Sequence, residues 1–340
     1  MANLTQVEEK SENKPFSECL ASFSGTDTYQ RILAFASLII LLIAFSIASP
    51  NFMQTSNMLA ILQATSVNGV LAIAATLVII TGGIDLSVGT LMTFTAVIAG
   101  VVLTYMGLPL PLGVIAAIGA GALCGLLSGT FIAKMKIPPF IATLGMMLIL
   151  KGLSLVISGA RPIYFNDTPG FDEISRGSLI GELIPSIPIP NGVVVLFLVA
   201  LVAAFVLSRT VLGRYTFAIG SNEEAVRLSG VNVDRWKMAI YALAGGICGI
   251  AGILIASRLN SAQPALGLGY ELEAIAAVVI GGTSLAGGRG TIIGTLIGAL
   301  IMAVLTNGLR VLSVDQEWQT VITGAIIILA VYADMMRRKQ

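Results

Sequence analysis

Long apolar runs recur along the whole chain, and each is long enough to cross a lipid bilayer as a helix. The hydrocarbon core of a membrane needs roughly 20 apolar residues per helix. Glycine clusters interrupt the eighth and ninth of these runs, so the ends of those two are the least sharply marked. We therefore expect an all-α integral membrane protein with about ten transmembrane helices, at Ile32–Ala48, Met58–Thr81, Val88–Met106, Leu110–Ala133, Phe140–Ser158, Val193–Ser208, Met238–Ser257, Leu272–Leu285, Thr291–Leu309 and Gln319–Met335.

The composition excludes several functional classes. Charged residues make up only 11% of the 340 residues, against about 25% in soluble domains, which is too few to cover a water-facing surface. The net charge of +1 argues against a nucleic-acid partner, which would require a basic patch. Histidine is absent, and Cys19, Cys124 and Cys248 do not have the spacing of metal ligands. We therefore expect no catalytic residue, metal site or cofactor in this chain.

The basic residues predict how the chain is oriented. Lys and Arg accumulate in the cytoplasmic loops of membrane proteins. If the N-terminus is cytoplasmic, most basic residues fall inside, and the outer side collects only Arg161, Arg176, Arg258, Arg310 and the late-helix Lys151. We expect both termini in the cytoplasm, with residues 1–30 as a polar tail and 31–340 as the transmembrane domain.

Two segments between the expected helices are long. Residues 159–192 would lie outside the membrane, and their prolines and acidic residues suit either a docking surface or a simple connector. Residues 208–237 would lie in the cytoplasm. There, Ser221 and Glu224 are spaced as in a capping box, a short helix is expected over 222–229, and Gly230 stands where a left-handed cap belongs. This capped helix suits a groove on a cytoplasmic partner, or is an ordinary loop helix.

Two glycine-rich hairpins join expected helices. In 82–89, Asp85 either caps the following helix or faces a polar interior, since a carboxylate is costly within the membrane. The hairpin 281–290 resembles a phosphate-binding loop, but it lacks the Lys-Ser/Thr pair that such a loop needs. We therefore expect no ATP binding by this chain. A similar Ala-rich stretch precedes both hairpins, which indicates either a parallel duplicated element or chance similarity.

A set of short motifs, in fixed order, carries a family resemblance from about Ser49 to the C-terminus. The chain resembles the permease subunits of ribose-type bacterial ABC sugar importers. The motifs lie at 49–52, 63–68, 84–89, 140–144, 212–215, 220–230, 261–264, 269–279 and 281–290.

The resemblance implies a multi-pass permease of the bacterial inner membrane that translocates a monosaccharide, such as ribose or a related sugar or polyol. Besides membrane lipid, the implied partners are a second permease copy, a cytoplasmic ABC subunit that binds and hydrolyses ATP, and a periplasmic sugar-binding protein. An ion-coupled secondary sugar transporter is the alternative, and it would need neither an ATPase nor a capped cytoplasmic helix. The implied coupling helix contains Ser221, Asn222, Glu223, Glu224, Ala225, Arg227, Leu228 and Gly230.

The solute path of such a permease should be mildly polar and should bind its solute weakly, so that the solute can leave. We expect Asn68, Asp85, Ser87 and Thr90 to line it.

Overall fold

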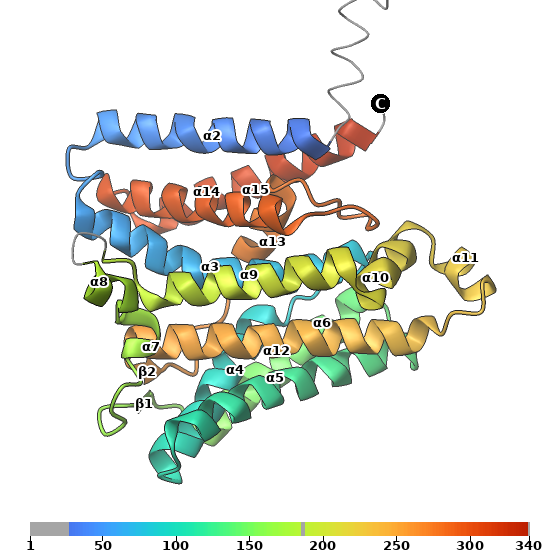
Figure 1. The fold of residues 1–340 in the computed structure, drawn as a ribbon, viewed down its shortest axis with the longest axis horizontal. Helices are drawn as coiled ribbons and strands as arrows, with labels where there is room; N and C mark the ends of the chain where they lie inside the picture. The colour runs from blue at the N-terminus through green and yellow to red at the C-terminus, as the bar shows by residue number, and fades with distance from the viewer. Residues whose placement is uncertain (1–26, 185–187, 339–340) are drawn as a thin grey trace, which may run out of the picture.

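The computed structural model describes residues 27–184 and 188–338. Of the expected polar tail, residues 1–26 lie outside the described residues, and residues 27–30 form the start of the first described helix. The helices run side by side along the length of the molecule (Figure 1). They are α2 (Asp27–Ala48), α3 (Thr55–Ile80), α4 (Val88–Gly100) with its π-helical continuation η1 (Val101–Tyr105), α5 (Leu110–Ala133), α6 (Pro139–Ser158), α7 (Glu173–Arg176), α8 (Leu179–Leu183), α9 (Asn191–Arg209), α10 (Val211–Ser221), α11 (Glu223–Leu228), α12 (Val233–Leu259), α13 (Tyr270–Ile280), α14 (Ile292–Val311) and α15 (Gln316–Arg338).

Seven helices within the described residues are long and apolar enough to cross a membrane: α3, α4 with η1, α5, α6, α9, α12 and α14. The apolar part of α2 is shorter, at Ile32–Ala48. One expected span is wrong as a full-length helix. Instead of reaching Leu285, α13 has 11 residues and ends at Ile280, where the chain turns through Gly282 with φ +89°. At 1.5 Å per residue, α13 covers only about half of a bilayer core.

The most extensive helix packing lies between α5 and α12. Gly121 and Gly125 of α5 face Gly245 and Gly249 of α12, and a Cβ atom at any of the four would collide with the backbone of the facing helix. Small residues allow this close approach, which stabilises helix pairs in lipid. The pair therefore forms a tightly packed unit, and α3 and α4 pack against α12.

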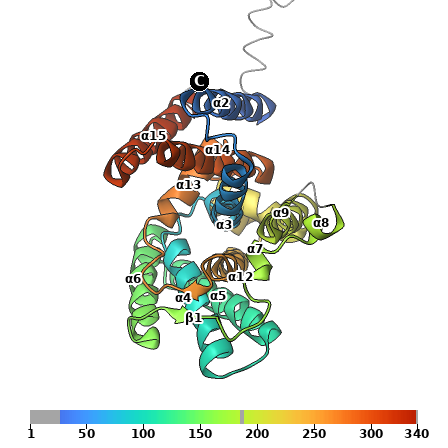
Figure 2. The ribbon, with the colours of Figure 1, turned by 90° about the vertical axis from the view of Figure 1, so that its left-hand side faces the viewer.

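Seen from one end, the helices form two groups with α3 and α13 between them (Figure 2). The first group contains α2, α14 and α15, and the second contains α4, α5, α6 and α12. Because α13 contacts α3, α14 and α15 as well as α4, this short helix connects the two groups.

The two long segments between helices lie at opposite ends of the molecule. One end carries α7, α8 and a two-stranded sheet, in which β1 (Ile163–Tyr164) pairs antiparallel with β2 (Ser261–Ala262). The other end carries α10 and α11, which extend beyond the neighbouring helices (Figure 1). If the long helices cross a membrane, the two segments lie on its opposite sides.

Candidate functional site

The projecting helix α11 is capped by Asn222. Its backbone is extended, with φ −159° and ψ 95°, and its side-chain oxygen accepts a hydrogen bond of 2.9 Å from the amide of Ala225. The expected N-cap, Ser221, is wrong by one residue because Ser221 is still the last residue of α10. Glu224 makes no hydrogen bond back to the cap among the described residues. At the other end Gly230 has φ +83°, which confirms the expected left-handed position.

Four ion pairs form a network around α11, and two of them join it to α12. Lys237 of α12 donates to Glu223 at 2.6 Å, and Arg227 pairs with the same carboxylate at 3.0 Å. Arg227 also reaches Asp234 at 3.1 Å, and Asp234 pairs with Lys136 of the α5–α6 turn at 2.9 Å. Partial burial raises the pKa of Glu223, but its hydrogen bonds and charge contacts with Lys237 and Arg227 outweigh that effect and lower the pKa below its ordinary value. The carboxylate is therefore ionised at neutral pH.

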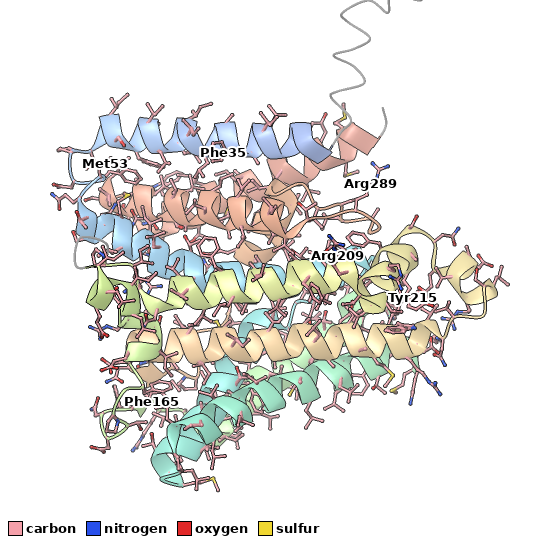
Figure 3. The ribbon with its side chains drawn as sticks, in the orientation of Figure 1. Phe35, Met53, Phe165, Arg209, Tyr215 and Arg289 are labelled. Carbon is pink, nitrogen blue, oxygen red and sulfur yellow. The ribbon has the colours of Figure 1, made fainter. Side chains whose placement is uncertain are left out.

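No residue of α11 is buried, which leaves its outer surface available to a partner. Leu228 is 83% exposed at its end. The preceding helix is better anchored, because the rings of Tyr215 in α10 and Trp236 in α12 pack with their centroids 4.8 Å apart. Figure 3 shows Tyr215 at this end of the molecule, together with Arg209 and the exposed Arg289. Helix α11 is thus exposed, and the helix α10 that precedes it is anchored to α12.

Three backbone segments meet where α10 ends. The amide of Gly288 donates to the carbonyl of Ile80 at the end of α3, at 2.8 Å. A Cβ atom at Gly220 would collide with that carbonyl, and one at Gly287 would lie 2.7 Å from the amide of Gly82. We call this contact of Ile80, Gly82, Gly220, Gly287 and Gly288 the glycine junction. It joins α10 to both hairpins.

Three of the four expected solute-path residues form one buried polar turn. The Asp85 carboxylate accepts from the amide and the hydroxyl of Ser87, at 2.8 and 2.6 Å, and the Thr90 hydroxyl donates to the Ser87 carbonyl at 3.1 Å. Their exposures are 5%, 1% and 2%. These bonds form a local turn before α4, whose N-cap position is Ser87 and has no side-chain capping bond, so Asp85 shapes the turn and does not cap the helix.

The fourth residue, Asn68, makes a different contact. It lies near the middle of α3, and its side-chain amide donates a hydrogen bond of 2.7 Å to Glu273 of α13. Glu273 was not among the residues expected to line the solute path. A signal was available, since an acidic residue in a short apolar helix bounded by Gly269 and Gly281 indicates a broken membrane span.

None of the four expected solute-path residues lines either of two cavities found among the described residues. One, of about 520 Å³, lies at the sheet end between 155–162 and 259–266. The other is an apolar groove of about 390 Å³ between α5, α9 and α12. Within the described ranges, no group of three or more His, Cys, Asp or Glu side chains could hold a metal ion.

Comparison with known proteins adds independent information. The family model described as branched-chain amino acid transport system / permease component matches residues 57–331. The ribose import permease protein RbsC of Escherichia coli (strain K12) is 45% identical over 302 residues, which cover 88% of this chain and 91% of that protein. The fructose import permease protein FrcC of Rhizobium meliloti is 42% identical, covering 89% and 84%. The xylose transport system permease protein XylH of E. coli (strain K12) is 32% identical, covering 94% and 95%. No solved structure matches the chain.

Proposed function

We propose that this chain is the membrane subunit of an ATP-driven ABC importer for a monosaccharide. The chain belongs to the family of branched-chain amino acid transport system permease components. The observation that carries the choice of solute is the 45% identity to a ribose import permease over 88% of the chain. Ribose or a related sugar or polyol is therefore the proposed solute. The chain itself is a non-catalytic, all-α membrane permease.

We further propose that it resides in the bacterial inner membrane with both termini in the cytoplasm. The basic residues favour this orientation, which places α10 and α11 inside and α7 and α8 outside. The expected total of about ten crossings is retained if α13 crosses the membrane together with the turns that lead from β2 to Gly269. Its own 11 residues are too few for a complete crossing.

The proposed partner of α11 is the cytoplasmic ATP-binding subunit. The helix projects, exposes Leu228 and is joined to α12 by two ion pairs, so a partner that binds it can transmit force to α12. The proposed contact residues are Ser221, Asn222, Glu223, Glu224, Ala225, Arg227, Leu228 and Gly230. We also propose a second permease copy and a periplasmic sugar-binding protein that docks at the α7–α8 end.

The proposed solute path passes Asn68. The hydrogen bonds of Asp85, Ser87 and Thr90 are made to one another, so we propose that these three residues shape the hairpin beside the path. No proton relay is required, because ATP hydrolysis supplies the driving force in the partner subunit.

The test is reconstitution in proteoliposomes with the ATP-binding subunit and the sugar-binding protein. Uptake of labelled ribose, fructose or xylose should require ATP, both partners and an intact ATPase site. It should persist when a protonophore collapses the proton gradient. Sugar uptake by the permease alone, driven by an ion gradient, would instead support the ion-coupled alternative.

A further inference from the structure

Glu273 places a carboxylate within the membrane-spanning part of the protein. It lies in the first turn of α13, partly buried, and its partner Asn68 is near the middle of the 26-residue α3. Figure 1 shows α13 in the interior of the molecule, far from both ends. Acidic residues are costly at such depths and are rare there unless they serve an ion or solute pathway.

The hydrogen bonds of Glu273 leave part of its polar surface unused. Only one oxygen, Oε2, accepts from Asn68, at 2.7 Å. In the described ranges no Lys or Arg nitrogen lies within 4.0 Å of the carboxylate. Neither Glu273 Oε1 nor Asn68 Oδ1 has a described hydrogen bond, and neither belongs to the buried atoms without partners. Both oxygens therefore remain accessible as acceptors.

The neighbouring acid Glu271 provides a contrast. Its side chain is 7% exposed, and both of its oxygens accept from the amide of Gly269 at 3.1 Å. Glu271 thus satisfies the backbone at the start of α13. Capping does not explain why a second carboxylate points at Asn68 on another helix.

We propose that Asn68 and Glu273 together form a transient binding site for the hydroxyl groups of the sugar as it crosses the membrane. This inference rests on the proposed function and names the contact residues of its solute. The two free oxygens can accept hydrogen bonds from neighbouring hydroxyls, and the Asn68 amide can donate one. Hydrogen bonds to a charged acceptor are stronger than those between neutral groups, which suits recognition of an uncharged polyol. The site joins two helices, so binding can respond to any movement of α13 against α3.

The experiment measures initial uptake of labelled ribose, fructose and xylose by the complete importer in proteoliposomes. Glu273→Gln retains size but removes the charge, and Asn68→Ser removes the amide from the opposite helix. Each should lower uptake of the transported sugar about tenfold or more, with the ATP-binding subunit still co-purifying and ATP still hydrolysed. The matched control is Glu271→Gln, which should leave the ranking of sugars unchanged.

A second measurement separates solute contact from a structural role. Wild-type uptake should fall when one sugar hydroxyl is replaced by hydrogen, and the Glu273→Gln variant should discriminate less between the sugar and that deoxy analogue. Equal discrimination by wild type and both variants, or wild-type uptake by both, would overturn the proposal. Import of none of the three sugars by the wild-type complex would instead contradict the proposed monosaccharide function.

Discussion

The amide of Gly288 donates a 2.8 Å hydrogen bond to the carbonyl of Ile80, which ties the second glycine hairpin to the C-terminal end of α3. The bond satisfies a carbonyl that the helix itself leaves unpaired. Gly220 packs on the same carbonyl from α10. A displacement of the α10–α11 segment would therefore also displace both hairpins and the helices that they join.

Substitution of Gly220 tests this junction. Gly220→Val should severely reduce the yield of assembled permease, because its Cβ would collide with backbone atoms of Ile80 that cannot move aside. The matched control is Gly145→Val on α6, where an added Cβ meets nothing within 4 Å. Size-exclusion profiles and thermal stability in detergent provide the measurement. Equal loss in both variants would contradict the role of the junction.

The position of the cap is tested by two adjacent alanine substitutions. Asn222→Ala should destabilise α11 by about 1 kcal/mol, because the amide of Ala225 loses its acceptor. Ser221→Ala should change it much less, since Ser221 belongs to α10. Hydrogen exchange at 223–228 measures the local effect, and co-purification of the ATP-binding subunit measures docking. A larger loss of protection for Ser221→Ala than for Asn222→Ala would instead support Ser221 as the N-cap, as expected from the sequence.

The attachment of α11 should depend on pH through Glu223. Its folded pKa is lowered, so its ion pairs stabilise the attachment fully above the ordinary pKa of about 4.3, and that contribution is lost as the pH falls through the lower, folded value. A spin label at Leu228→Cys, in a Cys19→Ser background, should show constant mobility from about pH 6 to 8 and greater mobility below about pH 4.

Glu223→Gln should reproduce the mobile state at neutral pH and remove most of the acid response. Glu224→Gln is the matched control, because Glu224 makes no ion pair among the described residues. If both variants keep the wild-type mobility, the ion pairs do not hold α11.

Topology can be tested with an impermeant thiol reagent on intact cells. Leu179→Cys and Asp315→Cys, both exposed, should react from outside, and Leu228→Cys should react only after permeabilisation. The background carries Cys19→Ser, and Cys124 and Cys248 are buried. Labelling of Leu228→Cys in intact cells would reverse the proposed orientation.

The apolar runs by themselves determined the membrane class and most helix positions. The expected run Leu110–Ala133 is the extent of α5, and α6, α9 and α14 lie close to their predicted bounds. These features follow from the chain locally, because apolar length sets where a helix can cross and a Gly such as Gly230 marks a left-handed position. The same local reasoning placed α13 correctly at its start but carried it past Gly281.

Only the tertiary structure decided which polar groups meet. Ser221 and Asn222 are equally suitable caps by residue type, and the continuation of α10, packed against Ile80 through Gly220, selects Asn222. Likewise, Asn68 pairs with Glu273 because α3 and α13 pack together in space, although the two residues are 205 positions apart. Hydrophobicity and helix signals act over a few turns of one segment, whereas a hydrogen bond between distant segments exists only once packing has brought them into contact.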